Sequence, residues 1–158
     1  MKKQIAVIGV ILLFVTLCFS GCELLEEKPD YITVTCSAQI TSYMLDKYNL
    51  LISERPSGLL IRVDFVKDGG ERSTFTCTSD SLGIAWTRTT SFKLYKEQPI
   101  QAIMTVQGGV LDFYPKEPVQ YKTLTWDYVD AAADFGGSYS WKPVFFVNLY
   151  NSTNSTNL

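Results

Sequence analysis

Apolar and polar residues alternate through most of the chain after residue 30, and this pattern predicts β-strands. In the stretch from Tyr31 to Thr41, every second residue from Ile32 to Ile40 is apolar or small, whereas Thr, Ser and Gln occupy the positions between them. A period of two is typical of a strand that buries one face. Because Cys36 belongs to the apolar set, we expect its side chain to face the interior.

The clearest predicted supersecondary unit is a β-hairpin in the middle of the chain. Two alternating runs, Leu59 to Val66 and Ser73 to Thr78, flank the sequence Lys-Asp-Gly-Gly-Glu at residues 67–71. Asp and Gly tolerate the positive φ angles that a tight reversal between twisted strands requires. Cys77 alternates in phase with Phe75, so it is also expected to face inward.

Further short runs rich in β-forming residues continue along the chain and are separated by Pro and Gly. The segment Ser42 to Arg55 fits either a helical stripe or a strand from Tyr48 to Ser53, and we favour the strand. The one predicted helical turn is the Ala-rich piece Val129 to Phe135, which Gly136 and Gly137 end. The remaining predicted strands are Gly83–Thr90, Ser91–Lys96, Ile100–Gln107, Val110–Tyr114, Val119–Tyr128 and Val144–Tyr150.

Many short strands without a long amphipathic helix indicate an all-β fold. We therefore predict one antiparallel β-sandwich domain over residues 31–150, with about seven to nine strands and an immunoglobulin-like architecture. The strand order stays open. In immunoglobulin domains a core Trp lies between the paired cysteines, whereas here all three Trp residues follow Cys77.

The first 22 residues follow a different pattern from the rest. Lys2 and Lys3 precede an apolar run from Ile5 to Phe19, and the small residues Ser20 and Gly21 then stand directly before Cys22. A basic start, a short apolar stretch and small residues at its exit are typical of an export signal. The apolar run is shorter than the roughly 20 residues that a membrane-spanning helix needs, so a permanent span is the weaker interpretation.

The sequence Phe19-Ser20-Gly21-Cys22 resembles a lipobox, the motif at which prokaryotic lipoproteins are cleaved and lipidated on the cysteine. The resemblance implies a signal peptide over residues 1–21, lipidation of Cys22 and a short acidic tether over residues 22–30. It also implies a protein held on the outer side of the cell membrane of a prokaryote. The alternative is an ordinary signal peptide beside a buried or disulfide-bonded Cys22.

Charge and cysteine content change with this cleavage. The chain has 14 Lys and Arg against 16 Asp and Glu, and loss of Lys2 and Lys3 leaves 12 against 16, a net charge of −4. An acidic protein is a poor partner for nucleic acid, and the lipid on Cys22 is then the whole membrane attachment. Cys36 and Cys77 remain as the only other cysteines, and two inward thiols in an oxidising compartment predict a disulfide between them. The alternative is two separate buried thiols.

The absence of His excludes the commonest catalytic chemistry. The chain has no His, and therefore no Ser-His triad, imidazole base or His-bound metal. No phosphate-binding loop or dinucleotide fingerprint is present either. We expect no enzymatic activity, cofactor or metal. A less favoured alternative is a carboxylate glycosidase, whose candidate residues are Asp112, Glu117, Asp127, Asp130 and Asp134. Another is a Ca²⁺ site formed by Asp127, Asp130 and Asp134.

Aromatic residues and the C-terminal tail supply the remaining candidate sites. Trp86, Trp126 and Trp141 are candidate binding aromatics that would stack on sugar rings or anchor a protein, with core packing as the alternative. Asn151 and Asn154 begin two N-x-S/T acceptors for glycosylation in the polar tail at residues 151–158. Together with the lipobox, glycosylation would resemble archaeal surface lipoproteins.

The sequence therefore predicts a non-enzymatic cell-surface lipoprotein. Its extracellular β-sandwich would have a binding or structural role at the envelope, with an envelope protein or polysaccharide as partner. The first alternative is a carbohydrate- or solute-binding module that uses exposed aromatic residues. The second is the His-free carboxylate glycosidase.

Overall fold

The computed structural model describes residues 30–46, 48–52, 54–108, 110, 112–129 and 137–151. In these ranges the chain forms eleven strands and one short 3₁₀ helix, η1 (Trp126–Tyr128). None of the helical residues described there makes a helix long and apolar enough to cross a bilayer. The predicted signal peptide, the lipidation site Cys22, Asn154 and all but the first residue of the predicted helical turn lie outside these ranges.

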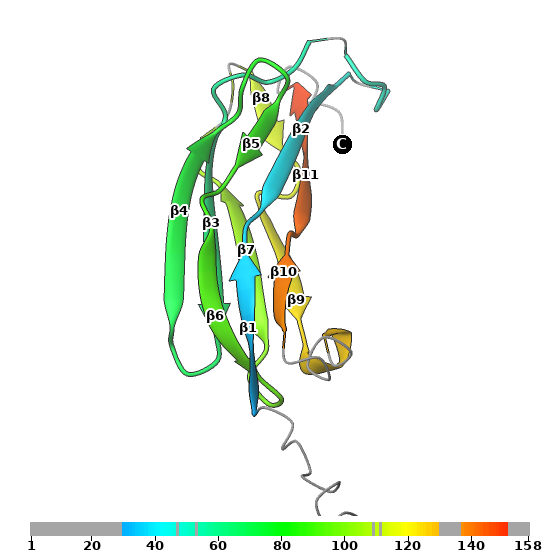
Figure 1. The fold of residues 1–158 in the computed structure, drawn as a ribbon. Coiled ribbons are helices and arrows are strands. Elements are labelled where there is room, and N and C mark those ends of the chain that lie inside the picture. The colour runs from blue at the N-terminus through cyan, green and yellow to red at the C-terminus, as the bar shows by residue number, and fades with distance from the viewer. Residues whose placement is uncertain are drawn as a thin grey trace, which may run out of the picture.

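One layer of the sandwich is built on two long parallel strands that are each interrupted once. Across the interruption, the backbone N–H groups of Ser37 and Gln39 donate to the carbonyl oxygens of Trp141 and Pro143, both at 3.1 Å. The two hydrogen-bonded sheets on either side of it therefore form one continuous layer (Figure 1). The first long strand consists of β1 (Tyr31–Cys36) and β2 (Gln39–Leu45), and the second of β10 (Ser138–Trp141) and β11 (Val144–Asn151).

The same layer has antiparallel strands on both sides of this pair. Its order is β10-β1-β6 in one half, with β6 (Thr90–Tyr95), and β5-β2-β11-β8 in the other, with β5 (Ile84–Trp86) and β8 (Phe113–Pro115). The second layer is antiparallel throughout, in the order β4-β3-β7-β9. Its strands are β3 (Leu60–Lys67), β4 (Arg72–Thr78), β7 (Ile100–Val106) and β9 (Val119–Leu124).

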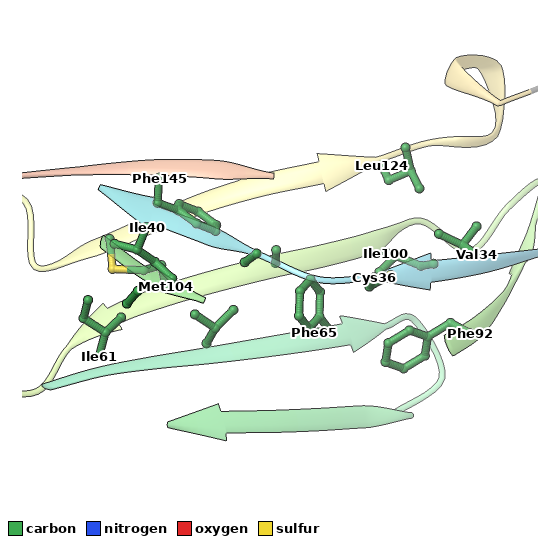
Figure 2. Packing of buried hydrophobic residues seen from close by; sticks show 14 of the residues in the cluster. Val34, Cys36, Ile40, Ile61, Phe65, Phe92, Ile100, Met104, Leu124 and Phe145 are labelled. Atoms are coloured by element: carbon green, nitrogen blue, oxygen red, sulfur yellow. The ribbon is translucent and has the colours of Figure 1, made fainter. Parts of the chain in front are cut away.

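The hydrophobic core fills the space between the two layers. Phe65 of β3 and Phe145 of β11 point into it from opposite layers (Figure 2), and neither is accessible to solvent. The ring of Trp141 meets the Phe65 ring edge-to-face, with 6.1 Å between the ring centroids. Each fully buried side chain of this size contributes about 1.5–3 kcal/mol to folding, so the core is the main source of stability.

The predicted β-sandwich and its hairpin are confirmed. β3 and β4 pair as predicted, and Gly69 and Gly70 in their turn have φ angles of 100° and 94°. Two pairings, β1 with β10 and β2 with β11, are parallel rather than antiparallel. Alternation defines the buried face of a strand, but it does not define the direction of its neighbour. The strands outnumber the prediction partly because each long strand counts twice.

The predicted strand from Tyr48 to Ser53 is wrong. The carboxylate of Asp46 accepts hydrogen bonds from the backbone N–H groups of Tyr48 and Leu50, at 2.8 and 2.9 Å. Such local side-chain bonds compete with a strand ladder and favour a turn. Among the described residues of this segment, β-pairing is limited to one isolated bridge between Leu45 and Leu51.

The predicted disulfide between Cys36 and Cys77 is also corrected, because both residues are free thiols. Cys36 is buried in β1, and its ladder partner Thr90 hydrogen-bonds to Ser73 of β4 through the two hydroxyl groups. Ser73 is four residues from Cys77, which is about 13 Å along a strand, whereas a disulfide requires Cα atoms within about 7 Å. Both side chains face inward as predicted, but at different levels of the sandwich.

Candidate functional site

The two long sides of the sandwich differ. On one side, β4 of the second layer and β6 of the first are joined by the hydrogen bond between the Ser73 and Thr90 hydroxyl groups, at 2.9 Å. On the other side, β9 and β10 are both edge strands, and no backbone ladder joins them. An open edge between two layers exposes inward-facing side chains, so a binding site is expected on this side.

A groove of about 760 Å³ lies between β9 and the β10–β11 strand. We call it the β9–β10 groove. Its volume falls in the range of about 300–1,000 Å³ that is usual for small-molecule sites. Leu124 and Pro143 supply buried apolar surface at its base. The polar and aromatic residues of its lining are Lys122, Thr123, Tyr128, Tyr139, Ser140, Trp141 and Lys142.

Lys122 enters the groove from the second layer. Its cross-strand partner in β7 is Ala102, which is fully buried and in turn pairs with Phe65 of β3. Directly opposed residues in a ladder share one face of the sheet, so the Lys122 side chain leaves the sheet on the core-facing side. The side chain stays exposed only because the layers are open at this edge.

β10 contributes the opposite wall. Since the carbonyl groups of Trp141 and Pro143 point toward β1 and β2, the alternation of a strand turns the backbone groups of Ser140, Lys142 and Val144 toward the open side. The half-buried side chain of Trp141 faces the core edge, where it packs on Phe65. The groove therefore combines aromatic surface with unpaired strand backbone.

The charged residues among the described lining of the groove are both lysines. Lys122 and Lys142 belong to this lining, and no Asp or Glu of the described residues does. Neither lysine forms an ion pair with a carboxylate of the described residues, whereas Lys67 binds Glu71 at 2.7 Å. In a chain with a net charge of −2, this groove is a locally positive site.

One end of the groove is closed by Gln120 of β9. Its side-chain amide donates a 2.6 Å hydrogen bond to the carbonyl oxygen of Phe146 in β11. The next outward carbonyl of β11, that of Asn148, accepts from the backbone N–H of Lys116 at 3.4 Å. The open edge is therefore restricted to β10 and the beginning of β11.

The three Trp residues predicted as a binding set do not come together. Trp86 is 57% exposed on the edge strand β5, on the outer face of the first layer. Trp126 is only 6% exposed and belongs to the core, which corrects its assignment as a binding residue. Burial follows from η1, which turns the Trp126 side chain beneath the end of the sandwich. Trp141 alone lines the groove.

The candidate carboxylates form no site in the described residues. Asp112, Glu117 and Asp127 are exposed, and no group of three or more Asp, Glu, Cys or His residues in that part of the chain is arranged to hold a metal. Asp130 and Asp134 lie outside the described residues. Asn151 ends β11 opposite Phe113 of β8, and its glycosylation stays a prediction.

Sequence reasoning missed two features of the groove. β10 was not predicted, and Lys122 was not singled out. A signal for Lys122 is present, because it alternates in phase with Gln120 and the buried Leu124. A lysine in the inward phase of a strand indicates either an edge that is protected from aggregation or a binding residue.

Comparisons with known proteins show no family for this chain. No protein-family description and no curated protein matches the chain. One similar solved structure is the minor pilin GBS52 of the Gram-positive pathogen Streptococcus agalactiae, with 8% sequence identity and a TM-score of 0.43. The match covers 74% of this chain and 45% of the pilin, so the chain spans less than half of that protein.

Proposed function

We propose that this protein is a non-enzymatic cell-surface lipoprotein whose β-sandwich binds a ligand of the envelope in the β9–β10 groove. The observation that carries the proposal is the contrast between the two sides of the sandwich. On one side a hydrogen bond between Ser73 and Thr90 joins the layers. The other side is joined by Gln120 and Phe146 at one end, and beyond that contact it opens into a groove lined by aromatic rings and by two lysines that have no carboxylate partner among the described residues. Such convergence of polar and aromatic groups in a concave surface is typical of binding sites.

The predicted anchor fits the position of this groove. Nine residue steps separate Cys22 from Tyr31, where β1 begins, and they span at most about 30 Å. β10 pairs with β1 near Tyr31, where the described chain enters the sandwich (Figure 1), so the residues of β10 that line the groove lie in the half of the domain where β1 begins. A lipid on Cys22 would hold the groove close to the outward face of the cell membrane, within reach of envelope polymers.

The residue types of the groove support binding rather than catalysis. Its lining contains lysine ammonium, phenol, hydroxyl and indole groups, and the chain contains no His. General acid–base catalysis by a carboxylate pair requires two carboxylates around one substrate bond. The described carboxylates of the sequence-based alternative, Asp112, Glu117 and Asp127, are not part of the lining.

The test is binding of the full-length protein, purified and kept in detergent, to envelopes that are isolated from the producing cells and freed of lipid, so that the lipid on Cys22 has no bilayer to enter. We expect the protein to sediment with the envelopes and the double variant Tyr128→Ala/Lys142→Gln to stay in the supernatant. A matched control is Tyr121→Ala/Arg88→Gln, which also removes one exposed ring and one charge but at residues that do not line the groove. Equal sedimentation of the groove variant and the wild type would show that the groove is not the site.

The exposed aromatic residues of the first layer favour a second candidate, a carbohydrate-binding face away from the groove. The rings of Tyr43 and Phe146 stack at 6.4 Å on the outer face of β2 and β11, and Trp86 lies on the neighbouring edge strand. Flat aromatic surface of this kind stacks on sugar rings. In the same sedimentation assay, loss of binding in Trp86→Ala but not in Tyr128→Ala/Lys142→Gln would favour this face.

A further inference from the structure

We infer that the ligand of the β9–β10 groove is an anionic polysaccharide, a chain of sugar rings that carries carboxylate or other acidic groups. This inference rests on the proposed function, because it names the ligand class of the same groove. Three properties of the groove carry it: its charge, its aromatic surface and the shortness of the free strand edge in the first layer.

The positive charge of the two lysines in the groove favours an anionic ligand. Lys122 of β9 and Lys142, which follows β10, both line the groove, and neither has a carboxylate partner among the described residues. Lys122 leaves its strand beside the buried Ala102, so its stem is placed against apolar surface and only its ammonium is left to be bound. Hydrogen bonds from an ammonium to an anionic oxygen are the stronger class, so each lysine favours an acidic group of the ligand.

The aromatic surface fits the flat faces of sugar rings. Tyr128 is 76% exposed at the end of the groove, and Tyr139 and Trp141 are half-buried along its β10 wall. These rings offer apolar faces, and the tyrosines add a hydroxyl group that donates and accepts hydrogen bonds. A sugar ring presents the matching combination, with C–H groups on its faces and hydroxyl groups at its rim.

The strand edge of the first layer is too short for a peptide to bind as an added strand. Strand addition requires a run of free N–H and C=O groups along an edge. On β11 the carbonyl oxygens of Phe146 and Asn148 already accept hydrogen bonds from Gln120 and Lys116. The edge of the first layer is also broken between β10, which ends at Trp141, and β11, which begins at Val144, so its free backbone groups form no long regular run. β9 keeps the edge of the other wall. Isolated groups such as those of the first layer bind hydroxyl groups of a sugar as well as they bind a peptide.

A purely structural role explains only one of these residues. An inward lysine on an edge strand prevents association of sheets edge to edge, and Lys122 fits that role. It does not account for Lys142 or for the exposed ring of Tyr128. The two roles are separated by measuring binding and self-association on the same variants.

The experiment is isothermal titration calorimetry of the detergent-purified full chain with oligogalacturonate, with its fully methyl-esterified form as the neutral counterpart. We expect the wild type to bind the neutral form about tenfold or more weakly than the acidic form. The variant Lys122→Gln/Lys142→Gln should bind the acidic form about tenfold or more weakly than the wild type does. The affinity should also fall as ionic strength rises from about 0.01 to 0.15 M, because the screening length shortens from about 30 to 8 Å. Arg88→Gln/Lys93→Gln, with the same change in charge, should bind as the wild type does. Binding of sulfated dextran but not of plain dextran, without binding of oligogalacturonate, would indicate that the ligand carries sulfate groups instead of carboxylate groups.

Four outcomes would overturn the inference. Equal affinity for the esterified and free oligosaccharides would remove the requirement for negative charge. Equal or tighter binding of polyglutamate would indicate an acidic polypeptide instead of a polysaccharide. If no acidic glycan binds while the wild type still sediments with envelopes and Tyr128→Ala/Lys142→Gln does not, the proposed function stands and the ligand class is wrong. Unchanged affinity of a double lysine variant that keeps the wild-type circular dichroism spectrum and stays monomeric would remove the groove as the site.

Discussion

The side-chain amide of Gln120 reaches from the edge strand of one layer to the backbone carbonyl of Phe146 in the other, at 2.6 Å. A strand carbonyl that faces outward would otherwise be free to pair with a strand of another molecule. The contact therefore joins the layers at one end of the β9–β10 groove and protects the edge of β11.

Removing this amide should weaken the domain slightly and expose the edge. We expect Gln120→Leu to lower the free energy of unfolding by about 0.5–1.5 kcal/mol, the usual net value of one hydrogen bond. Self-association should increase, because the Phe146 carbonyl loses its partner. Urea denaturation and sedimentation velocity measure the two effects. The matched variant Gln101→Leu changes an exposed glutamine within β7, and a monomeric Gln120→Leu protein would contradict the protective role.

Cys36 makes the stability of the domain sensitive to high pH. Burial raises the pKa of the Cys36 thiol to about 12, and burial also raises the pKa of Cys77. The unfolded chain loses the thiol proton near pH 9, so the stabilising effect is complete below that pH and is lost as the pH rises toward 12. Cys36→Val should therefore show a smaller fall in the free energy of unfolding between pH 8 and pH 10.5.

Denaturation curves of the wild type and of Cys36→Val at the two pH values test this linkage. All other titrating groups are common to both proteins, so the difference between them reports Cys36. The slope attributable to one thiol is at most about 1.4 kcal/mol per pH unit. At neutral pH the folded protein should also react slowly with iodoacetamide at Cys36, because the thiolate is the nucleophile. Rapid alkylation of Cys36 in the folded state would show that the thiol is neither buried nor protonated.

The two Trp residues outside the groove should differ sharply on substitution. Trp126→Ala removes a core side chain and should destabilise the domain by about 3–5 kcal/mol. Trp86→Ala removes an exposed side chain and should change the stability by about 0.5 kcal/mol or less. Thermal unfolding of both variants measures the difference, and similar melting temperatures would contradict the burial of Trp126.

Cys22→Ser tests the predicted anchor. Without the thiol, no lipid can be attached at this position, so we expect the protein to move from the detergent phase to the aqueous phase or to remain as uncleaved precursor. Phase separation and mass spectrometry of the N-terminus report the result. Unchanged partitioning together with an unchanged N-terminus would contradict lipidation of Cys22, and it would leave the β-sandwich unaffected.

Alternation in the sequence predicted the buried faces well, because it depends only on local geometry. Ile32, Val34 and Cys36 are buried as expected, and the Asp-Gly-Gly turn identified its hairpin. Relations between distant segments were not predictable in this way. The parallel pairing of β1 with β10 and the distance between Cys36 and Cys77 depend on how the layers stack.

Prediction of the candidate site was limited in the same way, because the site also depends on how distant segments are arranged. Trp126 and Trp141 are both aromatic residues in the second half of the chain, and composition alone does not separate them. Only the position of η1 buries the first, and only the open edge beside β10 exposes part of the second. Lys122 was the residue that local pattern could have revealed, since a charge in an inward phase conflicts with burial unless the edge is open.

The parallel arrangement of the first and last strands has a mechanical consequence. β1 begins at one end of the sandwich and β11 ends at the other, so a pull between Tyr31 and Asn151 is directed along both strands (Figure 1). Such a force loads the two parallel ladders, β1 with β10 and β2 with β11, in shear, and their hydrogen bonds must rupture together instead of opening one after another. A domain tethered at its N-terminal side and pulled from the far side would resist extension through this central pair.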